Sequence, residues 1–376
     1  MPHAKMRELA QLGQSLWIDN ISRSMITSGK LKSLIGQGLR GQTSNPTIFK
    51  QAISTSHDYD RDILALTRAG KSTFDIYDEL TIKDVGEAAD LFRGVYDQTK
   101  GLDGYVSLEI NPKLANESDA QSQEGLRLWR KLNRPNAMIK VPATKNGCLV
   151  VEKLISQGVN VNVTLIFSAE QYSQVVWAYC KGIKVLAQRG GDPSRVRSVA
   201  SVFVSRLDTA VDQWIDGQSD NADAARKIQL MSLRGAAAVS NCEIIFHKFQ
   251  NAFASDEFKG LEAQGARLQR VLWASTGTKD PKYSDLKYVT ELMASPTVNT
   301  LPDKTLDAYL DHGTVKTALP YDVARAQGTI GQLRLLGIDV NVVCGKLLEE
   351  GLAAFEKSFE ELMASIEEKS RQCVSH

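Results

Sequence analysis

Short stretches of alternating apolar and polar residues recur along the chain, separated by segments in which apolar residues recur every three or four positions. The first pattern is typical of β-strands and the second of amphipathic helices. The alternation predicts strands at residues 15–21, 42–45, 104–110, 136–144, 159–167, 196–207, 269–275 and 297–301. Alternation of strand and helix eight times over roughly 300 residues predicts an α/β fold, a parallel (β/α)8 TIM barrel, because a doubly wound sheet seldom repeats so regularly.

Helical patterns fill the intervals between the strands. They include residues 56–68, 82–100, 118–132, 169–188 and 208–264, the last interrupted at 217–221 and 254–256. Near the C-terminus, one apolar stripe marks a long helix at about 340–370, formed by Leu348, Leu352, Phe355, Phe359, Leu362 and Ile366. We expect this helix to pack across the barrel, with a coiled-coil dimer as the alternative. Residues 1–376 then form a single barrel domain with additional N-terminal, inserted and C-terminal helices.

One lysine interrupts an otherwise apolar strand. Lys140 lies on the same face as Met138 and Pro142, so it points where its neighbours bury surface. Removing an ammonium group from water favours the neutral amine, which is a nucleophile. The alternative is a lysine that extends along an apolar wall to water or pairs with a carboxylate.

Further polar residues occupy the predicted strands towards their carboxyl ends, where (β/α)8 barrels hold their catalytic groups. These residues are Asp19, Asn45, Glu109, Lys140, Asn162, Thr164 and Ser201. Each unpaired buried polar group costs about 1–3 kcal/mol, so a set of this size indicates a polar pocket with the lysine at its floor.

A lysine beside two carboxylates suits covalent catalysis on a ketone. The amine adds to the carbonyl, water leaves, and the resulting iminium accepts the electrons of a breaking carbon–carbon bond. One carboxylate would move protons through the carbinolamine, and the other would take the proton of the hydroxyl whose carbon departs. Amide and hydroxyl side chains would hold the hydroxyl groups of a sugar.

Composition restricts the range of partners. Lys and Arg total 45 against 44 Asp and Glu, so the net charge is +1. This balance does not indicate binding to nucleic acid or to an anionic membrane surface. No stretch of about 20 residues is free of charge, and the N-terminus lacks the apolar core of a signal peptide. Five scattered cysteines indicate reduced thiols, and no spacing suggests a metal site. We therefore expect a cytoplasmic protein that needs no metal or cofactor.

Three glycines offer a competing interpretation. Gly36, Gly38 and Gly41 have the spacing of a dinucleotide-binding fingerprint, which would indicate a nicotinamide-dependent dehydrogenase. That fingerprint needs a strand before it and a helix after it, whereas here a helical pattern precedes and a strand follows. A helix C-cap followed by a turn is the simpler interpretation. A barrel without catalysis, serving as a scaffold, is disfavoured because every proposed catalytic position carries a competent group.

Five segments resemble the strand signatures of the transaldolase family in the right order: TSNPTIF, VSLEI, MIKVPAT, NVTLIFS and SVFVSRLD. The resemblance runs from about Leu16 to the C-terminal helix and is closest to the longer bacterial-type forms. It implies transfer of a dihydroxyacetone unit from sedoheptulose 7-phosphate to glyceraldehyde 3-phosphate, giving erythrose 4-phosphate and fructose 6-phosphate. This reaction belongs to the non-oxidative pentose phosphate pathway.

The resemblance also implies roles for individual residues. Lys140 would form the Schiff base, Glu109 with Thr164 and a water molecule would handle its formation and hydrolysis, and Asp19 would be the acid/base for cleavage. The remaining roles concern the substrate: Asn45, Asn162 and Ser201 would hold the dihydroxyacetone hydroxyls, and Arg206 the phosphate.

One departure from the family concerns the phosphate. Many transaldolases carry a second phosphate-binding arginine just after the seventh strand, where this chain reads WASTGTKDP. Lys279 would substitute, although an ammonium is a point charge and not a bidentate fork; alternatively it is an ordinary solvated lysine. The closest functional alternative is a Schiff-base aldolase on the same barrel that releases dihydroxyacetone. The protein is expected to be a monomer or a homodimer.

Replacing the lysine tests its assignment directly. Lys140→Met should abolish turnover while leaving the fold intact, because an apolar chain of the same length is tolerated at a buried position at a cost below about 1.5 kcal/mol. Borohydride trapping with a ketose phosphate, followed by peptide mapping, should label Lys140 in the native protein. A label on another lysine would overturn the assignment.

Overall fold

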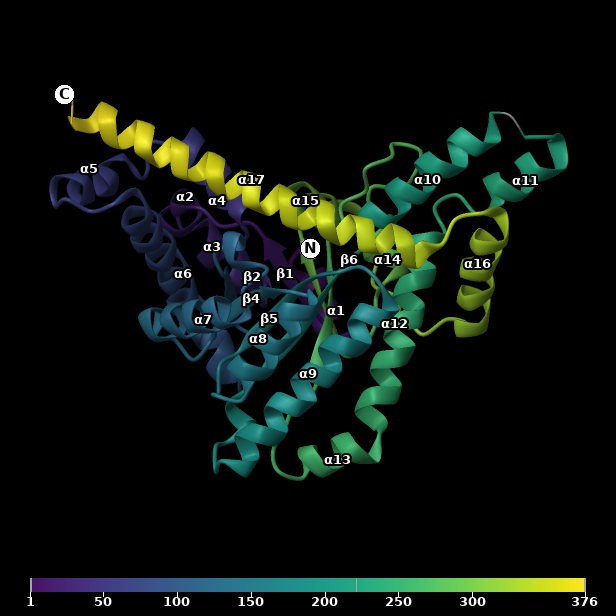
Figure 1. Ribbon diagram of the computed structural model, residues 1–376, viewed down its shortest axis with the longest axis horizontal. Coiled ribbons are helices and arrows are strands. Elements are labelled where there is room, and N and C mark those ends of the chain that lie inside the picture. Colours follow the sequence, from purple (N-terminus) through teal and green to yellow (C-terminus); the bar gives the residue numbers. More distant parts are fainter. Residues whose placement is uncertain (1, 221, 375–376) are drawn as a thin grey trace.

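The computed structural model describes residues 2–220 and 222–374 and shows a closed barrel of eight parallel strands (Figure 1). The strands follow one another around the barrel in chain order, which confirms the predicted (β/α)8 architecture. They are β1 (Gln14–Asp19), β2 (Gly41–Thr43), β3 (Tyr105–Glu109), β4 (Ala137–Pro142), β5 (Val161–Ile166), β6 (Ser198–Phe203), β7 (Gln269–Ala274) and β8 (Thr297–Leu301).

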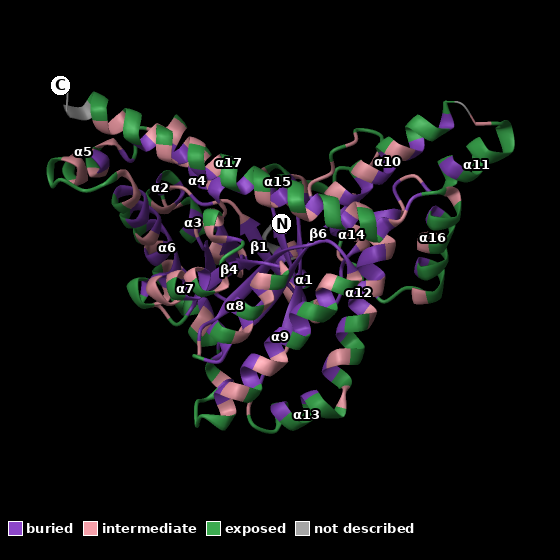
Figure 2. Ribbon diagram, in the orientation of Figure 1, coloured by how far each residue is buried: buried purple, intermediate pink, exposed green. Residues whose placement is uncertain are grey.

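Helices surround this barrel and cover it at both ends. Those of the first half are α1 (Pro2–Leu12), α2 (Arg23–Thr27), α3 (Lys30–Gln37), α4 (Pro46–Thr55), α5 (Asp60–Arg68), α6 (Thr73–Gln98), α7 (Ser118–Leu132) and α8 (Lys145–Ile155). The second half adds α9 (Ala169–Gln188), α10 (Ser205–Ser219), α11 (Ala224–Ser232), α12 (Ala237–Ala254), α13 (Asp256–Glu262), α14 (Lys287–Glu291), α15 (Asp303–His312), α16 (Val323–Leu336) and α17 (Val340–Val374). Figure 2 shows buried residues concentrated in the strands and on the inward faces of the helices.

The predicted helices at 118–132 and 169–188 are confirmed as α7 and α9. The prediction for 82–100 was wrong at its start, because α6 begins at Thr73. There Ser72 accepts a hydrogen bond from the Asp75 N–H, and the Asp75 side chain accepts one from the Ser72 N–H, a capping box that fixes the first turn.

Two further boundaries differ from the predictions. The helix predicted at 56–68 begins only at Asp60, as α5. A separate helix, α4, precedes it and begins at Pro46, a residue favoured at the first helical position. The predicted strand at 196–207 ends at Phe203, since Ser205 already begins α10. Of the interruptions predicted in 208–264, the one at 254–256 is confirmed by the break at Ser255. The one predicted at 217–221 was wrong at its start, because α10 continues to Ser219; α11 begins at Ala224, and residue 221 lies outside the described residues.

The amino-terminal end of the barrel is closed by a buried polar cluster. Arg270 of β7 donates to Ser15 of β1 at 2.8 Å and pairs with Asp103 at 2.8 Å, while Ser15 donates to Asp103 at 2.9 Å. Each charge in this cluster therefore has a partner, as buried charges require. Access to the barrel interior is left at the opposite end.

Two of the three glycines of the fingerprint, Gly38 and Gly41, are explained by backbone conformation and packing. Gly38 ends α3 with φ +121°, a conformation that favours glycine, and its N–H donates to Ile35. Gly41 begins β2 directly opposite Trp17 of β1, and a Cβ there would lie 2.4 Å from the indole ring. Gly36 lies within α3, Gly38 follows that helix, and Gly41 begins a strand, so the fingerprint's required order of strand, glycines and helix is absent from this segment.

The last helix runs across the carboxyl end of the barrel, from the side of α10 and α16 to α5 (Figure 1). Its Phe359 packs edge-to-face against Tyr77 of α6 at 5.1 Å between ring centroids. Lys369 pairs with Asp60 of α5 at 2.6 Å, and Lys50 of α4 pairs with Glu361. These contacts hold α17 over the strand ends.

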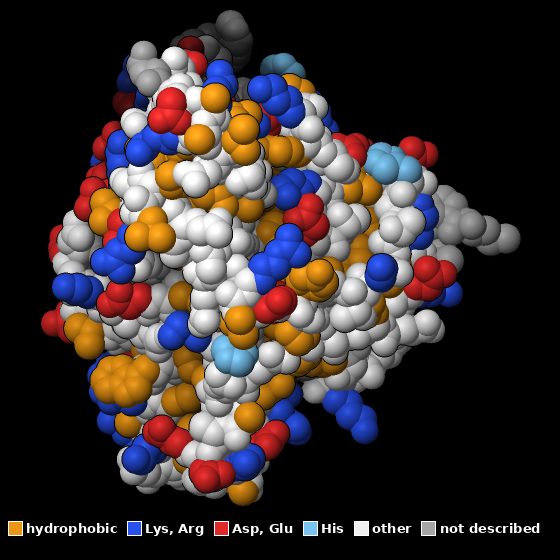
Figure 3. All heavy atoms as spheres, turned by 90° about the vertical axis from the view of Figure 1, so that its right-hand side faces the viewer, with side chains coloured by type: hydrophobic (Ala, Val, Ile, Leu, Met, Phe, Trp, Pro, Cys, Tyr) orange, Lys and Arg blue, Asp and Glu red, His pale blue; other side chains and the backbone are white. Residues whose placement is uncertain are grey.

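Basic and acidic side chains are interspersed on the face that carries α10, α11 and α16 (Figure 3). Within the described part of the chain, no helix is both long enough and apolar enough to cross a membrane. Cys148, Cys180, Cys242 and Cys344 are free thiols, and the side chain of Cys373 lies outside the described residues.

The contact between Gly41 and Trp17 generates a stability prediction. Gly41→Ala should destabilise the protein by about 1–3 kcal/mol in denaturant unfolding, because the methyl group overlaps a rigid ring in the barrel interior. Gly36→Ala is the matched control: nothing lies within 4 Å of its Cβ, and it lies in α3. This control should be stabilised by up to about 1 kcal/mol through helix propensity. Equal stability of the two variants would contradict the packing argument.

Candidate active site

Lys140 lies in β4 with its side chain inside the barrel and only 4% of its surface exposed. Its Nζ donates to the Ser44 carbonyl oxygen at 3.0 Å and lies 3.8 Å from Oε2 of Glu109. The ring centroid of Phe355, from α17, is 5.9 Å away. The amine is therefore shielded from bulk water, with one backbone acceptor and one carboxylate beside it.

Glu109 is opposite Lys140 because β3 and β4 pair in that register. Burial raises the pKa of Glu109 to about 7; the nearby Lys140 opposes this shift and Asp19 adds to it. Oε2 of Glu109 has no hydrogen-bond partner among the described residues. A carboxyl group that titrates near neutral pH can both donate and accept a proton under physiological conditions.

Asp19 is the last residue of β1 and is partly exposed at the rim of the pocket. Thr43 of β2 donates to it at 2.7 Å, and the Thr43 hydroxyl is also 2.7 Å from that of Thr300. Loss of hydration raises the pKa of Asp19, while Lys140 and the Thr43 hydrogen bond oppose this rise. Lys140 thus interacts electrostatically with both Asp19 and Glu109, but these two carboxyl groups differ in exposure and hydrogen bonding.

Asn162 and Ser201 form a hydrogen-bonded row on the next strands. Ser201 donates to Asn162 at 2.7 Å, and Asn162 donates to Ser107 of β3 at 3.0 Å. Both side chains are fully buried. Their positions are fixed by these bonds before any substrate binds.

Thr164 is buried in β5, two residues nearer its carboxyl end than Asn162. Its hydroxyl has no hydrogen-bond partner among the described residues. The next residue, Leu165, adopts φ +60°, and the β5–β6 register shifts between Val163 and Ile166. A left-handed leucine costs about 1–3 kcal/mol, and such strain tends to occur where a side chain must be aimed. Leu165 packs against Gly351 of α17, where a Cβ would lie 2.9 Å from the leucine side chain.

Two cations lie at the outer part of the site. Arg206 is in the first turn of α10, has no ion-pair or hydrogen-bond partner in the described chain, and lies 5.4 Å from the Phe203 ring centroid. Burial lowers the pKa of this guanidinium. Glu350 is near enough to oppose this shift but forms no ion pair with the guanidinium. A partly buried arginine that forms no ion pair within the described residues, at a helix N-terminus, is suited to an anionic ligand.

Lys279, the other cation, is exposed in the segment between β7 and α14.

Asn45 follows β2 and caps α4, where its Oδ1 accepts a hydrogen bond from the Ile48 N–H at 3.0 Å. The Asn45 side-chain amide remains available to a ligand.

Six of the nine predicted residues line one pocket of about 200 Å³: Asp19, Asn45, Lys140, Ser201, Arg206 and Lys279. Glu109, Asn162 and Thr164 are buried in the barrel strands beside Lys140. The pocket also includes residues that the sequence analysis did not single out: Thr43, Thr47, Ile48, Phe203, Ala274, Ser275, Gly277, Thr300, Pro302 and Phe355. Strand alternation could have identified Thr43 and Thr300, but no local signal relates Phe355 to the lysine.

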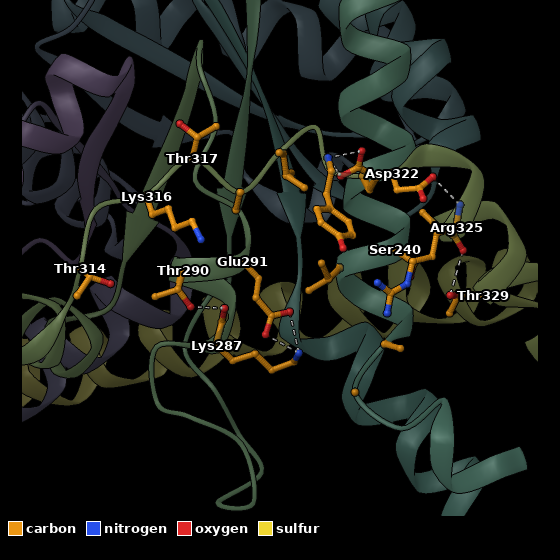
Figure 4. A pocket seen from close by; sticks show the side chains of 18 residues that line it. Ser240, Lys287, Thr290, Glu291, Thr314, Lys316, Thr317, Asp322, Arg325 and Thr329 are labelled. Carbon is orange, nitrogen blue, oxygen red and sulfur yellow. Dashed lines mark hydrogen bonds and ion pairs between the residues drawn. The ribbon is translucent and has the colours of Figure 1, made fainter. Parts of the chain in front are cut away.

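A larger pocket of about 790 Å³ lies elsewhere, between α12, α14 and the segment that leads into α16 (Figure 4). Lys316 and Arg325 reach towards it from opposite sides, and Lys287 pairs with Glu291 at 3.0 Å. None of the nine predicted residues lines this pocket. We assign the chemistry to the smaller pocket because it is lined by a buried amine and by Asp19, and because Glu109 lies directly beside that amine; burial raises the pKa of both carboxyl groups.

A buried lysine with two carboxylates at this end of a (β/α)8 barrel is typical of enzymes that act through a lysine Schiff base. The chain matches the family described as Transaldolase/Fructose-6-phosphate aldolase over residues 16–366, and it belongs to this family. The predicted resemblance is therefore confirmed.

Individual relatives match over nearly their whole length. A transaldolase of Trichodesmium erythraeum is 43% identical over 369 residues, covering 97% of each chain. Transaldolase 2 of a Nostoc species is 43% identical over 367 residues, covering 96% of each. A transaldolase of Saccharopolyspora erythraea is 42% identical over 372 residues, covering 98% of this chain and 99% of its own.

The raised pKa of Glu109 leads to a pH prediction. If protonated Glu109 supplies the proton for loss of water from the carbinolamine, imine formation should slow as the pH rises through about 7. In Glu109→Gln this falling limb should disappear, and the rate at pH 6 should drop by about 10²–10⁴-fold. Stopped-flow or quench measurements of imine formation across about pH 4–9, a range that includes the ordinary and the raised pKa of the Glu109 carboxyl, would measure both effects.

Glu360→Gln is the control for that measurement. Glu360 lies on α17 in an exposed ion pair with Lys113 at 2.8 Å. Its replacement should leave the pH profile unchanged. An unaltered falling limb in Glu109→Gln would show that another group governs this step.

Proposed function

We propose that this chain is a transaldolase, which transfers a dihydroxyacetone unit from a ketose phosphate to an aldose phosphate through a Schiff base on Lys140. The observation that carries the proposal is the buried amine of Lys140, 3.8 Å from Glu109, in a chain that belongs to this family. The chemistry needs no cofactor, because the iminium is itself the electron sink.

The proposed reaction begins when the Lys140 amine adds to the ketone carbon of the donor. Glu109 supplies the proton with which the carbonyl oxygen leaves as water, and the Thr164 hydroxyl, which has no hydrogen-bond partner among the described residues, helps to hold that water. The product of this step is an iminium. The reverse step, with water adding to the iminium, would use the same groups.

Cleavage follows when Asp19 takes the proton of the C4 hydroxyl and the C3–C4 bond breaks. The bonding electrons neutralise the iminium, an enamine forms, and the aldehyde fragment leaves. The enamine then attacks the carbonyl carbon of the acceptor, and Asp19 returns its proton to the new hydroxyl. The partly exposed position of Asp19 at the rim supports this role, because the departing carbon lies further out than the imine.

Substrate hydroxyls would be held by Asn45, Asn162 and Ser201, and the phosphate by Arg206 and Lys279. The hydrogen-bonded row of Asn162 and Ser201 supports the first part, and the unpaired guanidinium of Arg206 the second. We further propose that residues 1–376 act as one domain, in the cytoplasm and in the non-oxidative pentose phosphate pathway. All nine proposed residues belong to one chain, which suits a monomer as well as a homodimer.

An assay with and without acceptor separates this function from a Schiff-base aldolase. Fructose 6-phosphate with erythrose 4-phosphate should give sedoheptulose 7-phosphate and glyceraldehyde 3-phosphate, whereas the donor alone should release dihydroxyacetone far more slowly. Release of free dihydroxyacetone at the full rate without an aldehyde would exclude a true transferase.

Asp19→Asn provides the matching variant. It should still form the imine, so borohydride should label Lys140, while transfer should fall by about 10²-fold or more because cleavage loses its base. Loss of labelling in this variant would place Asp19 in imine formation instead.

A further inference from the structure

Arg234, between α11 and α12, joins three segments that are far apart in the sequence. Its guanidinium contacts Asp216 of α10 through two bonds of 2.9 Å and Asp280 of the β7–α14 segment at 2.9 Å. It also donates to the Tyr283 hydroxyl at 3.0 Å. Only 11% of the Arg234 side chain is exposed, whereas the Asp216 and Asp280 side chains are 49% and 25% exposed. The guanidinium is therefore covered by its neighbours, while Asp216 remains open to solvent.

A second set of bonds closes the same network. The Tyr283 hydroxyl donates to Asp212 of α10 at 2.7 Å, and Asp212 accepts a hydrogen bond from the Gly235 N–H at 2.8 Å. Gly235 has φ +70°, and a Cβ there would lie 2.7 Å from the Tyr283 ring. The tyrosine is thus held against a backbone that only glycine suits.

This network fixes the two elements that supply cations to the pocket. Arg206 begins α10, the helix that carries Asp212 and Asp216. Lys279 precedes Asp280 directly in the β7–α14 segment, and this segment also contributes Ser275 and Gly277 to the pocket. Lys279 itself has no ion-pair or hydrogen-bond partner among the residues described. Its position therefore depends on how firmly its backbone is held.

We propose that Arg234 is a positioning residue that holds Lys279 at the outer end of the pocket and so makes the enzyme favour phosphorylated aldehyde acceptors over unphosphorylated ones. The proposal rests on the proposed transaldolase function. Arg234 does not line the pocket. It acts through the neighbouring Asp280 and through Tyr283, so its loss should weaken binding of the phosphate and spare the chemistry.

Acceptor selectivity is the decisive measurement. In ping-pong kinetics kcat/KM for the acceptor reports the second half-reaction alone, so sedoheptulose 7-phosphate can serve as the donor throughout, with release of erythrose 4-phosphate. In Arg234→Gln, kcat/KM for glyceraldehyde 3-phosphate should fall about tenfold, the equivalent of one charge-assisted hydrogen bond. The value for unphosphorylated glyceraldehyde should change by less than about twofold, and borohydride labelling of Lys140 should persist.

Lys279→Ala tests whether Arg234 acts through the lysine. This variant should lose a similar factor for glyceraldehyde 3-phosphate, and adding Arg234→Gln to it should lower the value little further. Full additivity of the two losses would overturn the proposal. So would an equal loss for both acceptors, or unchanged kinetics in Arg234→Gln.

Arg93→Gln is the matched control, because Arg93 also contacts a carboxylate, Asp97, through two bonds but lies on the exposed face of α6. It should leave both acceptors unaffected. If Arg234→Gln does not fold, Tyr283→Phe removes only the hydroxyl that links Arg234 to Asp212 and should shift selectivity in the same direction. A wild-type protein that transfers to neither aldehyde would refute the proposed function; transfer to both without the shift would refute this inference alone.

Discussion

The structure depends on keeping one amine and one carboxyl group together inside a barrel that excludes water. Lys140 and Glu109 are both almost completely buried and lie 3.8 Å apart. Burying such groups is costly unless each has a partner, and the pKa of Glu109, raised to about 7, shows how strongly the environment disfavours its charged form. Much of the surrounding architecture serves to maintain this pair.

Three features of the fold support that environment. The cluster of Arg270, Asp103 and Ser15 closes the barrel at the amino-terminal end of its strands. The bonds between Ser201, Asn162 and Ser107 hold polar side chains in place within the interior. At the carboxyl end, α17 covers the site with Phe355. Each feature either removes water or satisfies a polar group. Near the lysine, Oε2 of Glu109 and the Thr164 hydroxyl have no hydrogen-bond partner among the described residues and are available to a substrate or a water molecule.

The sequence predicted the strands and most of the candidate site for a simple reason. A polar residue in an apolar strand is conspicuous, as at Lys140 and Glu109, and strands in a barrel pair with their neighbours in chain order. Their register then brings these two residues side by side. Contacts between distant segments left no such local signal: neither the position of Phe355 over Lys140 nor the contacts of Arg234 could be deduced from spacing. The start of α6 was missed because a capping box, and not an apolar stripe, determines it.

The placement of α17 also determines the direction from which a substrate can approach. Its Phe355 lies over the amine, and Gly351 allows the helix to come close to Leu165 and Arg206. The pocket's outer boundary is instead formed by Arg206 and by Lys279, which is exposed. A phosphorylated sugar bound as proposed would therefore enter with its ketone directed towards Lys140 and its phosphate towards Arg206 and Lys279. The separation between the phosphate group and the carbonyl carbon of a sugar would then decide whether its ketone reaches the lysine.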